Sequence, residues 1–167
     1  MRFACVFLAF GMFAGCSAKR EEAATKPSPP EAQTPVDEST KVIIETPAGL
    51  QTVSVEVVYT PPKIERGLMY REHLGIDAGM LFFMGGEADH TFYMRNTLIP
   101  LDMIFITKEM TIAGVVANAE PRTESLRSVG KPSLYVLEVN GGWAAAHQVA
   151  AGAKVRFEAL PAALKRP

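Results

Sequence analysis

Six polar residues of this 167-residue chain have the types and the spacing to form a site. They are Arg66, Arg71, Asn96, Thr97, Asp102 and Glu138. An arginine could bind the Asp102 carboxylate through two hydrogen bonds, a charge-assisted contact worth about 1.5–3 kcal/mol when partly buried. Asn96 and Thr97 add donors and acceptors at a turn, and loops on rigid sheets often bind ligands. The six residues therefore indicate either a polar pocket for a sugar or an anionic group, or a structural network that pins turns and a helix to the sheet.

Two of these residues are acids, and a pair of acids can hydrolyse a glycosidic bond. A glycosidase needs two carboxyl groups about 5–10 Å apart. Asp102 and Glu138 are the acids within the strands that carry the six residues. A polysaccharide hydrolase that uses them as acid and base is therefore an alternative, and it requires both carboxyls in one open cleft.

A histidine and four methionines could bind copper(I), which prefers imidazole and thioether ligands. They are His90, Met80, Met84, Met94 and Met103. Four residues apart on a strand, His90 and Met94 would share a face at a separation of roughly 13 Å. Core packing explains methionines in apolar strands equally well. We expect core methionines and no resident metal or cofactor, with copper binding as a weaker alternative.

The remaining candidate side chains are two histidines and a few aromatics. His73 and His147 belong to no Ser-His-Asp or HExxH pattern, so they are expected at the surface or in caps. Tyr93 and Trp143 could stack on a sugar ring, although a single tryptophan is more often a partly buried edge of a core.

Short strands dominate the elements that must position these residues. The expected strands cover residues 42–44, 52–59, 80–84, 91–94, 101–107, 111–117, 133–139 and 154–160. One helix is expected at 63–74 as an insertion rather than part of a βαβ repeat, with one or two helical turns at 143–149. This pattern predicts a mainly β domain, either a sandwich or a barrel.

The N-terminus is typical of an exported lipoprotein. Residues 3–13 form an apolar run that matches a signal-peptide core and is too short to span a bilayer as a helix. Residues 13–16 (FAGC) resemble a lipobox, so residues 1–15 are predicted to be removed and Cys16 to be lipidated. A secretory signal cleaved nearby is the alternative. Because Ser17 follows the cysteine, we expect the periplasmic face of the outer membrane.

Residues 16–40 are predicted to be a disordered tether, and residues 41–167 a single domain. Four prolines, five acids and no aromatic lie between residues 17 and 40, which leaves too little apolar surface to form a core. The whole chain has 17 Lys+Arg and 18 Asp+Glu, and residues 41–167 carry thirteen of each. Such a balance argues against a nucleic-acid binder.

Five short motifs in the domain form an ordered series. They are residues 66–69 (RGLM), 79–82 (GMLF), 94–97 (MRNT), 99–102 (IPLD) and 135–138 (YVLE). The series resembles the bacterial and archaeal family called domain of unknown function 192, over roughly residues 41–160. Tyr93 stands where that family commonly has tryptophan. The resemblance implies a jelly-roll-like, frequently exported β domain without an assigned activity, and therefore no catalytic residue.

Together these observations predict a jelly-roll-like sandwich or closed barrel of about seven to eight strands, with one short helix after the second strand. The expected function is a lipid-anchored, non-enzymatic binding or accessory module of the cell envelope, monomeric, for a glycan or another extracytoplasmic polar ligand or a protein partner. An envelope polysaccharide hydrolase and a periplasmic copper-binding protein are the alternatives.

Overall fold

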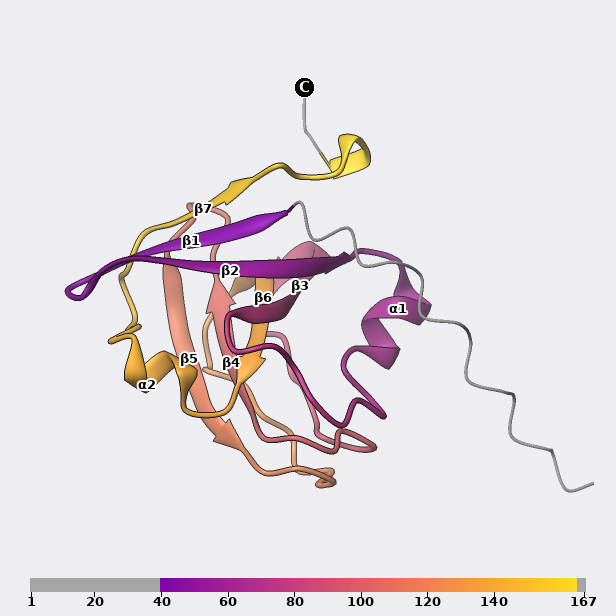
Figure 1. The fold of residues 1–167 in the computed structure, drawn as a ribbon. Helices are drawn as coiled ribbons and strands as arrows, with labels where there is room; N and C mark the ends of the chain where they lie inside the picture. Colours follow the sequence, from indigo (N-terminus) through magenta and orange to yellow (C-terminus); the bar gives the residue numbers. More distant parts are fainter. Residues whose placement is uncertain (1–39, 165–167) are drawn as a thin grey trace, which may run out of the picture. The chain divides into compact units, whose positions relative to one another are not determined.

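The computed structural model describes residues 40–164, which form a β domain (Figure 1). The elements are β1 Lys41–Thr46, β2 Gly49–Val58, α1 Pro61–Arg66, β3 Ala78–Ala88, β4 Leu101–Ile106, β5 Ile112–Ala119, β6 Ser133–Asn140, α2 Trp143–Ala146, β7 Val155–Glu158 and the 3-10 helix η1 Ala162–Leu164. Between residues 40 and 164, no helix is long and apolar enough to cross a membrane. The predicted signal peptide, Cys16 and residues 16–39 of the predicted tether lie outside the described residues.

The seven strands form one sheet in the order β5-β4-β6-β3-β2-β1-β7, and this sheet curls into a half-barrel (Figure 1). Its two edge strands approach each other at a single bridge between Thr111 and Lys154. Backbone hydrogen bonds extend this contact from Ile112 N to Ala153 O (3.0 Å) and from Val155 N to Met110 O (2.9 Å). The mainly β prediction is confirmed. The structure shows one curled sheet and does not confirm the expected sandwich or closed barrel.

Two hydrophobic cores lie on the two faces of this sheet. The inner core receives side chains from all seven strands, including Val42, Leu81, Ile104 and Leu137, as the concave face of a curled sheet must. The outer core contains Met80, Phe82, Met103, Phe105 and Val136 together with Leu68 and Met94 from the connections. Alternate residues of β3, β4 and β6 therefore face opposite cores. This alternation makes each central strand apolar on both sides, as the run at 80–84 predicted.

The helix after the second strand is shorter than the sequence indicated. Helix α1 covers Pro61–Arg66, whereas the periodicity predicted 63–74, and α2 forms a second short helix. The chain leaves α1 at Gly67, whose φ of 45° favours glycine. A Cβ at this position would lie 3.2 Å from Phe82 Cζ, so close packing on the outer core also requires glycine there.

Strand pairing corrects two further expectations. All neighbouring strands are antiparallel except β2 and β3, which are parallel in register from Ser54–Ala78 to Val58–Phe82. Parallel neighbours need a long crossover connection, so α1 belongs to a crossover and is more than an insertion. The strand expected at 91–94 is reduced to one bridge between Phe92 and Arg127.

Candidate functional site

The carboxylate of Asp102 is completely buried and bonded to three backbone amides. Its Oδ1 accepts hydrogen bonds from the N–H groups of Asn118 (2.6 Å) and Gly142 (3.0 Å), and Oδ2 accepts one from Ala144 (2.7 Å). Two of these donors lie at the start of α2, where backbone N–H groups have no partner within the helix. In place of the arginine pair suggested by the sequence, Asp102 therefore joins β4, the end of β5 and the start of α2.

Arg71 pairs with a different acid. Its guanidinium contacts both carboxylate oxygens of Glu56 on β2, with 2.7 Å between Nη2 and Oε2. The two side chains are 29% and 22% exposed, so the pair lies at the edge of the outer core. Arg66 is the last residue of α1, and its side chain is exposed. The Arg71–Glu56 pair ties the crossover connection to the strand that precedes it.

Asn96 and Thr97 form a tight turn that is tied to its neighbours through the backbone. Asn96 adopts a φ of 60°, and its carbonyl accepts a hydrogen bond from the Tyr70 amide (2.8 Å). Thr97 is 5% exposed, its N–H donates to Met94 O (3.1 Å), and its carbonyl accepts from Arg122 N (3.1 Å). These contacts hold three connections together, which corresponds to the structural interpretation of the turn.

Glu138 is the one residue of the six that lies in an apolar site without a partner. It is 5% exposed on β6, opposite Met80 of β3 and Met103 of β4, both of which belong to the outer core. Among residues 40–164, desolvation is the one influence on its carboxyl, and no neighbouring charge or hydrogen bond offsets it. Burial without compensation raises the pKa of its carboxyl from 4.5 to about 8. Glu138 therefore holds a proton at neutral pH.

The two acids cannot form a glycosidase pair. Asp102 pairs with Val139, which faces the inner core, whereas Glu138 pairs with Met103, which faces the outer core. The sheet itself separates the two carboxyls, so they share no cleft. The hydrolase alternative loses its catalytic pair.

The aromatic candidates differ in exposure. Trp143 is 5% exposed, stacks on His147 at 4.2 Å between ring centroids, and donates its indole N–H to Asp77 Oδ1 (3.1 Å). It is therefore part of the inner core, as the alternative interpretation held. Tyr93 is half-buried beneath the Arg95 guanidinium, which lies 5.1 Å from the ring centroid. Burial and the stacked His147 leave Trp143 no free face for a sugar, and the Arg95 guanidinium covers one face of Tyr93.

Most of the copper candidates are residues of the outer core. Met80, Met94 and Met103 are buried in the outer core, and His90 Nε2 lies 2.9 Å from Gly86 O. In the part of the chain that the structure describes, no group of three or more His, Cys, Asp or Glu residues is placed to hold a metal ion. Packing in the outer core accounts for these methionines without a metal.

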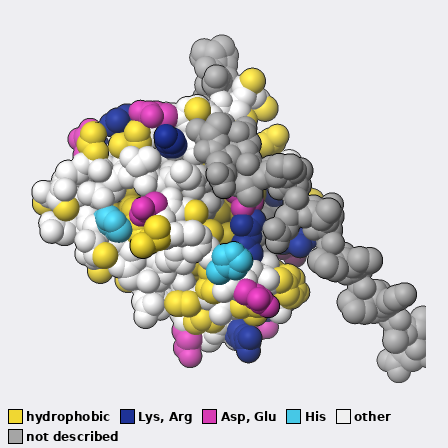
Figure 2. Space-filling model, viewed as in Figure 1, with side chains coloured by type: hydrophobic (Ala, Val, Ile, Leu, Met, Phe, Trp, Pro, Cys, Tyr) yellow, Lys and Arg dark blue, Asp and Glu magenta, His cyan; other side chains and the backbone are white. Residues whose placement is uncertain are grey.

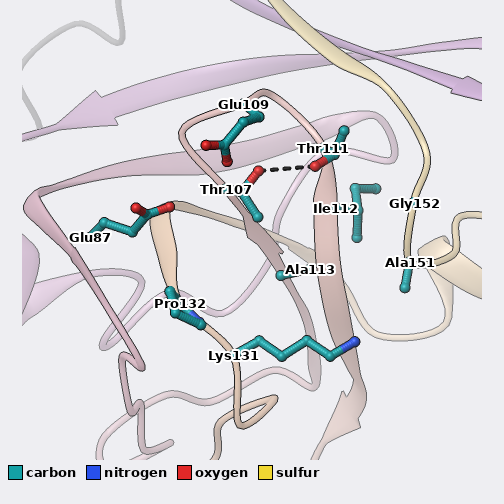
Figure 3. Close-up of a pocket in the computed structure, with 10 residues that line it drawn as sticks. All are labelled: Glu87, Thr107, Glu109, Thr111, Ile112, Ala113, Lys131, Pro132, Ala151 and Gly152. Atoms are coloured by element: carbon teal, nitrogen blue, oxygen red, sulfur yellow. Dashed lines mark hydrogen bonds between the residues drawn. The ribbon is translucent and has the colours of Figure 1, made fainter.

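A polar hollow that the sequence did not indicate lies beside the β4–β5 turn. Its polar side chains are Glu87, Thr107, Glu109, Thr111 and Lys131, and its volume is about 600 Å³. Figure 3 shows the two glutamates and the lysine approaching it from different sides. We call it the polar hollow. Its residues come from four separate stretches of the chain, so no local motif could have revealed it.

The side chains of the polar hollow are partly bonded to one another and to its rim. The Thr107 and Thr111 hydroxyls lie 2.9 Å apart (Figure 3). Glu87 forms an ion pair with Lys108 (3.0 Å between Oε2 and Nζ), and this hydrogen bond lowers the pKa of the Glu87 carboxyl. The hollow thus holds acceptors and donors, with carboxylates on one side and the Lys131 ammonium on the other.

Residues 41–157 match the family model DUF192, "Uncharacterized ACR". Two solved structures are similar. A protein of unknown function from Novosphingobium aromaticivorans DSM 12444 has 37% identity and a TM-score of 0.68, over 70% of this chain and 83% of its own. A protein from Sinorhizobium meliloti 1021, described as a proposed transcription regulator, has 34% identity and a TM-score of 0.69, over 74% of this chain and 98% of its own. No curated protein matches the sequence.

The Sinorhizobium protein also bears on the independence of the domain. Nearly its entire length aligns with this chain, so the β domain exists there without a long additional segment. All seven strands and both cores of the present chain likewise lie within residues 40–164. A fragment of residues 40–167 therefore contains everything that the fold requires.

Proposed function

The chain belongs to the DUF192 family, and from this premise we propose that it is a non-enzymatic binding or accessory module of the cell envelope. Its ligand is a glycan or another extracytoplasmic polar molecule. The polar hollow is the single observation that carries the proposal, because polar side chains of both charges converge there around open space. We therefore place the proposed binding site at the polar hollow and not at Asn96 and Asp102, whose hydrogen bonds hold parts of the fold together.

The chemistry of the polar hollow suits a ligand rich in hydroxyl groups. Carboxylates such as Glu109 accept hydrogen bonds from pairs of sugar hydroxyls, and the Lys131 ammonium donates to ring or carboxylate oxygens. The apolar lining from Ile112, Ala113 and Pro132 provides contact area for the C–H faces of a ring. Open access on one side fits a segment of a long polymer better than a small enclosed metabolite.

The proposed location of the protein rests on its N-terminal sequence. Lipidation at Cys16 and residues 17–39 as a tether would hold the domain close to the membrane surface, with a reach of roughly 25–30 Å. At the periplasmic face of the outer membrane, this range includes envelope polysaccharides and other anchored proteins. Positive and negative side chains are interspersed on the face shown in Figure 2, which favours such partners over nucleic acid.

Thermal unfolding of the 40–167 fragment tests the proposal. The fragment is heated with cell-wall muropeptides and with purified envelope polysaccharides, and unfolding is followed by fluorescence of Trp143. A bound ligand at a hundredfold excess over its Kd adds about 2.7 kcal/mol and raises Tm by on the order of 10 °C. The absence of a shift with every glycan would overturn the proposal.

Paired variants assign the site. Glu109→Gln and Lys131→Met should reduce the ligand-induced shift, since each removes a polar group that lines the polar hollow. Glu124→Gln and Lys63→Met change the same charges at exposed positions elsewhere and should leave the shift unchanged. Equal shifts in all four variants would place the ligand outside the polar hollow.

A further inference from the structure

One lysine is shared by the two carboxylates that line the polar hollow. Lys108 Nζ lies 3.0 Å from Glu87 Oε2 and 3.8 Å from Glu109 Oε1, so both acids are within reach of a single ammonium group. Glu87 lies near the end of β3, whereas Lys108 and Glu109 belong to the turn between β4 and β5. This side of the polar hollow is therefore built to hold one cation between two acids.

The lysine that holds this position is itself easily displaced. Lys108 contacts the two acids from the rim and is not among the residues that line the polar hollow. Its side chain is 60% exposed, and those of Glu87 and Glu109 are 25% and 62% exposed. Ion pairs at such exposure contribute little, because water and salt compete for both partners. A second ammonium group that enters from the polar hollow can replace Lys108 at little cost.

Glu87 remains charged and oriented when this exchange occurs. The hydrogen bond from the Lys108 ammonium lowers the pKa of the Glu87 carboxyl, so the carboxylate is ionised at neutral pH. The backbone N–H of Lys108 also donates to Glu87 Oε1 (3.4 Å). This backbone contact does not depend on the lysine side chain, so it persists when another cation takes the place of the ammonium.

The other polar groups of the hollow suit hydroxyl groups. The Thr107 and Thr111 hydroxyls lie 2.9 Å apart, and Lys131 lines the hollow from a separate segment (Figure 3). A pair of hydroxyls both donates and accepts hydrogen bonds, and an ammonium group donates to ring and hydroxyl oxygens. The polar hollow thus combines a position for a cation with partners for a body rich in hydroxyl groups.

A buried hydroxyl beside the hollow lacks a partner within the domain. Ser133 follows Pro132 in the chain and pairs with Ala88, the residue after Glu87. Its side chain is completely buried, and its Oγ has no hydrogen-bond partner among residues 40–164. Because buried polar groups are almost always hydrogen-bonded, this hydroxyl favours a bound polar molecule next to Glu87 and Pro132.

We propose that the polar hollow binds a saccharide with a free ammonium group, which replaces the Lys108 ammonium between Glu87 and Glu109. The inference rests on the proposed function, since it names the class of glycan that the hollow binds. An ammonium group suits two carboxylates better than a metal ion does, because no group of three or more His, Cys, Asp or Glu residues is placed to hold a metal between residues 40 and 164.

Two matched oligosaccharides test the proposal. The linear tetramers of glucosamine and of N-acetylglucosamine share a backbone and differ in whether the amino groups are free. Each is titrated into the 40–167 fragment by calorimetry in a slightly acidic buffer, in which the free amino groups are protonated. The glucosamine tetramer should bind about tenfold more tightly, since its ammonium groups form charge-assisted hydrogen bonds.

The outcomes separate this inference from the proposed function. Equal or tighter binding of the acetylated tetramer, or no binding of either tetramer, would overturn the inference, and the proposed function would stand if another glycan raises Tm. If every glycan fails to raise Tm, both are wrong.

Removal of the internal lysine gives the sharpest variant, because it should strengthen binding. Lys108→Met removes the competing ammonium, so the affinity for the glucosamine tetramer should rise about threefold or more. Lys63→Met removes an exposed cation of α1 and should leave this affinity unchanged. Neither variant should alter binding of the acetylated tetramer. An affinity for the glucosamine tetramer that falls or stays the same in Lys108→Met would show that the ammonium group does not bind between the two acids.

A second pair of variants tests the carboxylates. Glu109→Gln should remove most of the preference for the free amine, whereas Glu124→Gln, an equally exposed change elsewhere, should retain it. Equal preferences in the two variants would overturn the assignment of the ammonium group to the polar hollow.

Discussion

Asp102 and Glu138 lie on adjacent strands but on opposite faces of the sheet. Asp102 pairs with Val139, the residue after Glu138, and this offset of one residue directs the two carboxyls in opposite directions. Asp102 meets three amide donors, whereas Glu138 meets the thioether side chains of Met80 and Met103. Asp102 and Glu138 therefore contribute differently to the stability of the domain, and the contribution of each can be measured.

Substitution of Glu138 should make the domain more stable at neutral and alkaline pH. The pKa of Glu138 is about 8 in the folded domain and near 4.5 in an unfolded chain, so the folded state binds the extra proton between these values. Stability from this group is therefore complete below pH 4.5 and falls as the pH rises toward 8, by on the order of 3–5 kcal/mol in all. Glu138→Gln should remove this slope and raise Tm above pH 7.

Urea unfolding of the fragment between pH 5 and pH 9 gives the measurement, and Glu124→Gln provides an exposed control. The slope attributed to Glu138 is the difference between the Glu138→Gln and the unsubstituted curves. A Gln variant that is less stable than the unsubstituted fragment at pH 9 would show that the carboxylate has a partner that compensates its burial.

Asp102→Asn should destabilise the domain without altering ligand binding at the polar hollow. An amide side chain has one acceptor oxygen for three backbone donors and places N–H groups against at least one of them. Loss of charge-assisted bonds at a fully buried position should cost about 2–4 kcal/mol. Fluorescence of the single tryptophan, which lies between two of the three donors, reports the unfolding directly.

The matched control is Asp89→Asn, which changes an exposed aspartate on the loop after β3. It should leave the free energy of unfolding within about 0.5 kcal/mol of the unsubstituted value. If Asp102→Asn folds with unchanged stability but loses the glycan-induced shift, Asp102 would be a binding residue after all.

The Arg71–Glu56 ion pair should contribute only modestly to the free energy of unfolding. Both side chains retain solvent contact, at 29% and 22% exposed, so a double-mutant cycle with Arg71→Ala and Glu56→Ala should give a coupling energy of about 0.5–1 kcal/mol. Urea unfolding at low and high salt measures it, and the coupling should decrease with salt. A coupling of zero at low salt would mean that the crossover connection is held by its apolar contacts alone.

Local sequence patterns were sufficient to predict most of the strands, because the alternation of side chains between two faces is a property of the strand itself. The prediction of a strand at 52–59 agrees with β2 to within a few residues, and the run at 80–84 lies within β3. The helix was overestimated because Gly67 packs on Phe82, a residue fifteen positions away that no helical periodicity includes. The parallel pairing of β2 with β3 likewise depends on where the crossover places the chain.

The site was harder to predict for a different reason. The partners of Asp102 are backbone amides of Asn118, Gly142 and Ala144. Because nearly every residue has a backbone N–H, the residue types at these positions do not reveal the contacts. The face occupied by Glu138 depends on the register of β4 and β6, which the sequence does not show. The polar hollow combines distant segments, so only the folded domain brings its residues together.

Two glycines of β3 should respond oppositely to substitution by alanine. A Cβ on Gly79 would lie 2.5 Å from the carbonyl oxygen of Glu138 and 3.2 Å from side-chain atoms of Val53 and Val139, whereas a Cβ on Gly86 would meet nothing within 4 Å. Because the obstruction at Gly79 is the backbone of a paired strand, Gly79→Ala should cost about 1–3 kcal/mol of unfolding free energy. Gly86→Ala should be neutral or stabilising by up to about 1 kcal/mol, since alanine restricts the unfolded chain. Urea unfolding of the two variants measures the difference in their unfolding free energies. Equal stabilities would mean that β3 and β6 can move apart at Gly79 without a cost in free energy.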